Sequence, residues 1–175
     1  MARGGASYFF TVVTHRRQRI LTKAPARDLL RTAMAAVRER LPFEVFAMVL
    51  LPDHLHCIWT LPPDDDDFPE RWRQIKGRFT HEYLAAGGRD WDVTEQHRRQ
   101  GRRGVWQPQY WKHRIHDEDD YLRYRDYIHL NRVKHGYVEN PGDWPWSSFH
   151  RHVEMGWLDA NWPGSSPVEL PPVDD

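Results

Sequence analysis

Apolar and polar positions along the first third of the chain predict three β-strands. Residues 7–14 (SYFFTVVT) and 43–51 (FEVFAMVLL) are rich in aromatic and β-branched side chains, which favour strands. Residues 54–61 (HLHCIWTL) have the same character. Only the dipeptide at 52–53, Pro-Asp, separates the last two runs, so we expect them to form an antiparallel hairpin with a tight turn.

Between and after these strands, apolar side chains recur at helical spacing. This spacing predicts one helix over residues 25–41 and a second over residues 68–88, where two glycines end the pattern. Residues 89–104 carry many charges and few apolar side chains, and we interpret them as a mobile loop. Residues 105–116 (VWQPQYWKHRIH) predict a fourth strand that is interrupted or bulged at Pro108.

A last helix is predicted over residues 117–136, because acidic residues crowd its first turn and basic residues its last. The resulting order, βαββαβ followed by a helix, is typical of a ferredoxin-like α+β fold with an antiparallel sheet and two helices on one face. We expect a single domain over residues 1–160. Residues 161–175 are rich in Pro and Ser, and we expect a flexible tail there.

The charges of the chain balance overall but are unevenly distributed. The chain has 25 Lys and Arg against 25 Asp and Glu, yet residues 71–114 are distinctly basic. Such a segment creates a local positive field, although a charge run equally fits a solvated face. The single cysteine, Cys57, has no internal disulfide partner, and no long apolar run or signal peptide is present. We therefore expect a cytoplasmic protein.

Two histidines in the third strand are candidates for chemistry. His54 and His56 are two positions apart, so both point to the face of the sheet opposite Leu55 and Trp59. Their rings could reach one metal ion, but two histidines alone equally fit ordinary hydrogen-bonded side chains. A third ligand could come from the last helix, where Tyr127, Asn131 and Lys134 share one face. His129 faces nearly the other way.

Several stretches together resemble a known family. They are LPDHLHCIWTLP, FPERWRQIKGRFT, VWQPQYWKHRIHDEDDYLRYRDYIHLNRVKHGYV and DWPWSSFHRHV. These stretches are similar to the REP-associated tyrosine transposases, a branch of the IS200-like, single-tyrosine HUH transposases, whose name denotes His, a hydrophobic residue and His. The resemblance runs from about residue 7 to 158. The combination of DHLH with YIHLN at this separation is specific, whereas either motif alone is not.

The resemblance implies a role for each matching position. His54 and His56 match the two metal ligands of the family, Tyr127 matches the nucleophile, and Asn131 matches the third ligand position. One departure is visible, because Arg132 stands where the family often has proline. This substitution leaves the implied ligands in place but changes the expected geometry of the helix after them.

The implied activity is that of a metal-dependent single-stranded DNA endonuclease and strand transferase. It would act beside REP-like hairpins through a covalent 5′-phosphotyrosine intermediate. An amide oxygen favours Mg²⁺ and two imidazoles favour Mn²⁺ or a softer ion, so we expect Mg²⁺ or Mn²⁺. The expected location is the bacterial cytoplasm, in association with the nucleoid. The resemblance leaves open whether the protein is a monomer or a homodimer.

Basic and aromatic side chains provide candidates for DNA contacts. Basic residues could follow the phosphate backbone, and aromatic residues could stack on unpaired bases. The candidates are Arg71, Lys76, Arg78, Arg102, Arg103, Trp106, Tyr110, Trp111, Lys112 and Lys134.

Two other functions compete with strand transfer. One is a non-catalytic module that binds DNA or RNA hairpins with the same fold. The other is a metal-dependent phosphodiesterase that uses water as its nucleophile and forms no protein–DNA adduct.

Overall fold

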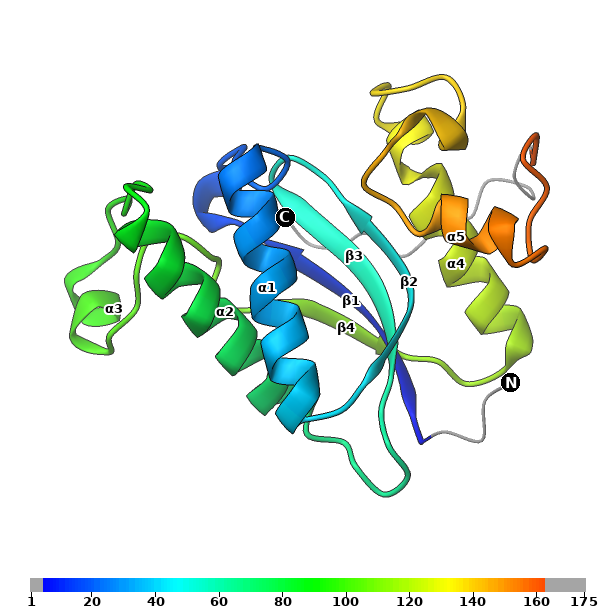
Figure 1. Cartoon of the computed structure of the whole chain (residues 1–175). Coiled ribbons are helices and arrows are strands. Elements are labelled where there is room, and N and C mark those ends of the chain that lie inside the picture. The colour runs from blue at the N-terminus through cyan, green and yellow to red at the C-terminus, as the bar shows by residue number, and fades with distance from the viewer. Residues whose placement is uncertain (1–4, 163–175) are drawn as a thin grey trace.

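A four-stranded antiparallel sheet forms the centre of the described part of the chain, residues 5–162 of a computed structural model (Figure 1). Its strands are β1 (Ser7–Val13), β2 (Glu44–Leu50), β3 (His54–Thr60) and β4 (Trp111–Arg114). They lie in the order β2-β3-β1-β4, and every neighbouring pair is antiparallel. The ferredoxin-like α+β fold predicted from the sequence is thereby confirmed.

Helices cover both faces of this sheet. Helices α1 (Ala24–Arg40) and α2 (Phe68–Ala85) lie on one face, and α4 (Glu118–Lys134) lies on the other (Figure 1). The alternation of β3 determines which residues each helix meets. Leu55 and Trp59 belong to the apolar cluster beneath α1 and α2, whereas Ile58 belongs to the separate cluster beneath α4.

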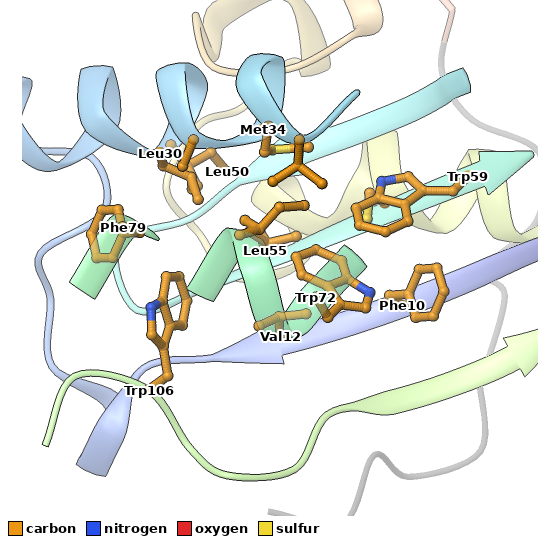
Figure 2. Packing of buried hydrophobic residues seen from close by; sticks show 14 of the residues in the cluster. Phe10, Val12, Leu30, Met34, Leu50, Leu55, Trp59, Trp72, Phe79 and Trp106 are labelled. Carbon is orange, nitrogen blue, oxygen red and sulfur yellow. The ribbon is translucent and has the colours of Figure 1, made fainter. Parts of the chain in front are cut away.

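The cluster beneath α1 and α2 is the larger one and is built around aromatic rings (Figure 2). The rings of Trp59 and Trp72 stack with their centroids 4.2 Å apart, and Phe10 lies edge-on to Trp59 at 5.1 Å. Burial of each such side chain contributes about 1.5–3 kcal/mol. Cys57 is completely buried here, and this burial raises the pKa of its thiol well above the usual range. The cluster makes β3 a rigid support for the residues on its opposite face.

Helix α4 is fixed to the sheet by the smaller cluster. The ring centroids of Phe9 and Tyr124 are 4.6 Å apart, and Ile128 is completely buried beside them. At the first turn the carboxylate of Asp117 accepts a hydrogen bond from the backbone N–H of Asp120 at 2.8 Å, which is a typical N-cap. These contacts set the position of every side chain that α4 points towards the sheet.

The outward face of α4 is held by the short helix α5 (Phe149–Glu154). His129 points away from Tyr127, and its Nε2 lies 3.0 Å from Nδ1 of His152 on α5. Arg132 is completely buried, and its guanidinium donates to the backbone carbonyls of His129 and Pro141. The helix continues to Lys134, so the arginine at the family's proline position does not interrupt it.

Two predictions for residues 89–116 need correction. Residues 89–104 are not simply a loop, because they contain helix α3 (Glu95–Arg99), whose N-terminus is capped by the Thr94 hydroxyl. The fourth strand is shorter than predicted, and only an isolated bridge between Thr14 and Trp106 represents its first part. Pro108, which lacks an N–H group, lies between the two pieces, so the interruption expected there is confirmed.

Two 3₁₀ turns complete the described chain: η1 (His15–Arg17) and η2 (Pro141–Asp143). Within residues 5–162, no helix is both long enough and apolar enough to cross a membrane. The flexible tail predicted for residues 161–175 lies, from residue 163 onwards, outside the described residues.

The buried arginine of α2 provides a test of what holds the fold together. Arg71 is 1% exposed, and its three guanidinium nitrogens donate to Asp65 and to the carbonyls of Leu41, Pro42 and Asp67. We expect Arg71→Met to lower the free energy of unfolding by about 2–4 kcal/mol, because buried acceptors lose their donor. Urea denaturation measures this change.

Arg73 is the matched control for this variant. It lies two residues further along α2, its side chain is 72% exposed, and it also pairs with a carboxylate, that of Glu70. Arg73→Met should change the unfolding free energy by less than about 1 kcal/mol, since exposed ion pairs contribute little. Equal effects of the two substitutions would contradict the structural role of Arg71.

The buried His129 makes stability depend on pH. Burial and the neighbouring charge of His152 lower the pKa of His129 to about 2, whereas in the unfolded chain the pKa is about 6.5. Below pH 6.5 the unfolded state therefore binds a proton that the folded state does not. The contribution of His129 to the unfolding free energy falls by up to about 1.4 kcal/mol per pH unit as the pH decreases. His129→Gln should show a shallower decrease between pH 6.5 and 5 in urea titrations, and an unchanged slope would contradict this assignment.

Candidate active site

Strand β3 places two imidazoles side by side beneath α4. The ring centroids of His54 and His56 are 4.9 Å apart, and the side chains are 7% and 2% exposed. Both lie on the face opposite Leu55, as the two-residue repeat of the strand predicts. The sequence prediction that the two rings share one site is therefore consistent with the geometry.

Each imidazole is oriented through its Nδ1 atom. Nδ1 of His54 donates to the carboxylate of Asp53 at 2.7 Å, and Nδ1 of His56 lies 2.8 Å from the hydroxyl of Thr11 on β1. With Nδ1 protonated and bonded in this way, Nε2 of each ring keeps its lone pair. Burial, and secondarily the charge of His54, lowers the pKa of His56 well below its usual value. His56 is therefore neutral near pH 7, the form that binds a metal ion.

Helix α4 brings two further functional groups to the same place. The ring of Tyr127 lies edge-on to the ring of His56, with a centroid separation of 5.2 Å and an interplanar angle of 72°. Asn131, one turn further along the helix, is 1% exposed. The structure thus brings together His54, His56 and Tyr127, and it places the amide of Asn131 beside the phenol of Tyr127.

The polar atoms of this site are buried without protein partners. Nε2 of His56 and both amide atoms of Asn131 lie out of contact with solvent and make no full hydrogen bond. Such atoms are uncommon in folded proteins, because losing water without gaining a partner costs about 1–3 kcal/mol each. A divalent cation would use the lone pairs of both imidazoles and of the amide oxygen, so the residues fit a Mg²⁺ or Mn²⁺ ion.

The amide is an essential part of this donor set. Among the described residues, no three His, Cys, Asp or Glu side chains converge in a way that could hold a metal ion. A site made of two imidazoles and one amide keeps coordination positions open, as catalytic metal sites do.

The phenol of Tyr127 is protonated at neutral pH. Burial raises its pKa above the usual value of 10, and the nearby amide of Asn131 partly opposes this shift. The ring also packs edge-on to Phe9 at 6.0 Å, which fixes its orientation. A phenol in this state becomes a good nucleophile only when it transfers its proton during the attack.

Sequence reasoning missed four residues around the metal-ligand candidates. Three of them are Thr11 and Asp53, which orient the two imidazoles, and His135, whose ring centroid lies 6.0 Å from that of His54. Arg17 joins them, with its guanidinium 3.6 Å from the carboxylate of Asp53. Asp53 could have been found from its place directly before the first histidine. Thr11 and Arg17 come from a distant segment, and only the pairing of β1 with β3 brings them here.

Two of the predicted DNA-contacting residues are wrong, because the structure buries them. Arg71 is 1% exposed and uses its guanidinium to hold Asp65 and the chain at Leu41. Trp106 is 6% exposed and packs edge-on to Phe79 in the larger apolar cluster, so its ring is not available for stacking on a base.

The other predicted DNA-contacting residues lie in several places. Lys76, Arg102, Arg103 and Tyr110 line one cleft beside α2, on the side of the sheet away from α4. The remaining candidates lie apart from that cleft: Arg78 on α2, Trp111 beneath α4, Lys112 over the ring of Phe68, and Lys134 at the end of α4. For these residues a role in DNA contact stays a prediction.

Comparisons with known proteins agree with this geometry. A family model described as "Transposase IS200 like" matches residues 4–131. The chain is 43% identical over 161 residues to the REP-associated tyrosine transposase of Escherichia coli K12, covering 91% of this chain and 86% of the relative. It is 38% identical over 169 residues to a putative REP-associated tyrosine transposase of Haemophilus influenzae, and the match covers 95% of this chain and 92% of the relative.

A solved structure extends the similarity to three dimensions. It is that of a REP-associated tyrosine transposase bound to a REP hairpin, with 40% sequence identity, a TM-score of 0.78 and coverage of 98% of this chain and 94% of the other. With the fold, the histidine pair and the tyrosine helix in place, these similarities extend over nearly the whole chain. The chain therefore belongs to the IS200-like transposase family and, within it, to the REP-associated tyrosine transposases.

Proposed function

We propose that this chain cuts and rejoins single-stranded DNA beside REP-like hairpins, with Tyr127 as the nucleophile. The observation that carries the proposal is that the phenol of Tyr127 lies against one of two oriented, buried imidazoles, with the buried amide of Asn131 beside the phenol. The structural relative bound to a REP hairpin supports a DNA hairpin as the partner.

Cleavage exchanges one phosphoester bond for another. The Oη atom of Tyr127 forms a bond to phosphorus while the bond between phosphorus and the 3′ oxygen breaks. The phenol loses its proton and the departing 3′ oxygen gains one, so the products are a 5′-phosphotyrosine and a free 3′-hydroxyl. Because the phosphoester bond is retained in this intermediate, a second 3′-hydroxyl can reverse the attack and join two strands.

His54, His56 and Asn131 are the residues that would hold a divalent metal ion, Mg²⁺ or Mn²⁺, in this proposal. When bound, such an ion withdraws electron density from the phosphate and orients the scissile bond. The protein orients the two imidazoles through Asp53 and Thr11 and excludes water with the apolar rings around Phe9. These positions are fixed before DNA arrives, which reduces the reorganisation needed for the attack.

One copy of the chain contains all of these groups. The ring of Tyr127 lies 5.2 Å from that of His56 on the same molecule. A second subunit is thus not required to complete the site, and we propose that a monomer is competent for cleavage.

Substitution of the nucleophile tests the proposed chemistry directly. The wild-type chain, incubated with Mn²⁺ and a pool of single-stranded hairpin oligonucleotides with randomised flanks, should give a protein–DNA adduct on a denaturing gel. Tyr127→Phe should reduce the adduct at least about a hundredfold while leaving oligonucleotide binding unchanged, because only the attacking oxygen is removed. Tyr124→Phe is the control, since Tyr124 packs three residues earlier on the same helix.

Three results would reject the proposal in different ways. Adduct formation by Tyr127→Phe would show that another residue is the nucleophile. Cleavage without any adduct in the wild-type chain would indicate a phosphodiesterase that uses water. Binding without cleavage across a titration of both metals would indicate a hairpin-binding module.

The hydrogen bond between Nδ1 of His56 and the hydroxyl of Thr11 provides a test of the metal site. Thr11→Val removes the partner of Nδ1, and we expect Mn²⁺ affinity to fall about tenfold or more, as measured by calorimetry and electron paramagnetic resonance. Thr60→Val is a matched control, because the Thr60 hydroxyl makes a 2.8 Å hydrogen bond to Ser7 between the same two strands. Equal Mn²⁺ affinities of wild type and Thr11→Val would contradict the orienting role.

A further inference from the structure

A cleft of about 900 Å³ lies between α2 and the segment 89–110, away from the tyrosine. No Asp or Glu side chain of the described residues lines it, whereas four Lys or Arg side chains do: Arg73, Lys76, Arg102 and Arg103. Its lining also includes Tyr110, which is partly exposed. A cleft with this lining favours an anionic ligand that also has a flat aromatic part.

Two other hollows of the described surface differ in charge. One is lined by Glu39 and Glu44 together with Arg38, and the other by Asp28 together with arginines of α1. In those hollows cations and carboxylates offset each other. The cleft beside α2 differs in having no carboxylate in its own lining; outside that lining, Arg73 pairs with Glu70 and Arg103 with Asp90.

Lys76 links the two walls of the cleft. Its ammonium group donates to the backbone carbonyls of Gln107 at 2.6 Å and Pro108 at 3.4 Å, and so ties the 89–110 segment to α2. Burial, with the charge of Arg102 nearby, lowers the pKa of Lys76 to about 8. Lys76 is accordingly part of the wall, while Arg102 is exposed at the rim and available to a ligand.

The cleft and the metal-ligand candidates meet at one end of the sheet. Thr14, at the end of β1, forms a β-bridge with Trp106 in the cleft wall. The backbone N–H and the hydroxyl of Thr14 both donate to the carbonyl of Asp53, each at 2.9 Å. Asp53 in turn orients His54, so only one strand end separates the cleft from the site of cleavage.

The corner between the two sites presents basic side chains. Arg16 and Arg17 have φ angles of 49° and 51°, a left-handed conformation that costs an L-residue roughly 1–2 kcal/mol. Arg16, Arg17 and Arg19 are exposed there. Strained backbone at such a position is typical of segments whose side chains serve a ligand.

From this continuity we infer that the cleft binds unpaired nucleotides of the same DNA strand whose scissile phosphate reaches Tyr127. The strand would pass over the corner formed by residues 15–19, with phosphates beside Arg102 and Arg103 and a base stacked on Tyr110. The inference rests on the proposed function for the identity of the DNA strand. It adds a second contact region on the opposite side of the sheet, which would position unpaired DNA relative to the hairpin.

Salt-dependent binding of two probes tests this inference. The probes are a fluorescein-labelled DNA hairpin with a short oligothymidine extension and the same hairpin without the extension, each bound to the full chain carrying Tyr127→Phe. Arg102→Ser should weaken binding of the extended probe and reduce the slope of log K against log salt by about 0.7, the value for one phosphate contact in single-stranded DNA. Tyr110→Ala should weaken it about fivefold or more through lost stacking.

Arg31→Ser is the matched control, because Arg31 is an exposed arginine on α1 that pairs with Asp28 and does not line the cleft. It should bind both probes like the parent chain. Because Tyr110 also packs near Phe10 and its loss could disturb the fold, photo-crosslinking of 5-iodouracil in the extension provides an independent readout. The crosslink is expected in the peptide that contains Tyr110.

Unchanged binding of the extended probe by Arg102→Ser, or a crosslink elsewhere, would overturn the inference. Equal weakening for both probes would also overturn it, because the cleft would then contact the duplex. Adduct formation by the chain with Tyr127 intact is measured separately. If no adduct forms but the cleft variants weaken binding of the extended probe, only the proposed strand transfer is rejected. If the adduct forms but the cleft variants leave binding unchanged, only the proposed role of the cleft is rejected.

Discussion

The two-residue repeat of strand β3 is the constraint on which the rest of the structure depends. Every second side chain enters the large aromatic cluster, so the intervening histidines are forced onto the other face. There α4 must cover them with a much smaller apolar cluster around Phe9, Tyr124 and Ile128. A shift of the β3 register by one residue would bury the imidazoles among tryptophans and move Trp59 out of the aromatic cluster to the face beneath α4, and the loss of both arrangements makes such a shift strongly unfavourable.

The sequence was sufficient to group the candidate site residues because their shared faces depend on local periodicities, whereas the role proposed for each residue came from the family resemblance. His54 and His56 share a face through the period of a strand, and Tyr127 and Asn131 share one through the period of a helix. The fold class followed from the order of these elements. The resemblance indicated that α4 lies over the face of the sheet that carries the two histidines. Periodicity alone does not show which element packs on which face.

What the sequence did not reveal depends on contacts between distant segments. Arg71 has the positive charge expected of a DNA-contacting residue, but its guanidinium donates to backbone carbonyls of the turn after α1. In the sequence Thr11 looks like an ordinary strand residue. Only the pairing of β1 with β3 places its hydroxyl beside His56. Helix α3 was missed because it is only five residues long and entirely polar, so a capping threonine was its principal signal.

The buried thiol of Cys57 has a practical consequence for the study of this protein. The sequence contains no other cysteine, and this one is enclosed beneath α1 and α2 with its thiolate form disfavoured. Maleimide dyes and spin labels will leave it unmodified in the folded state. A cysteine introduced at an exposed position is then the sole attachment point, so spectroscopic rulers can be placed on the molecule without first removing a native side chain from its interior.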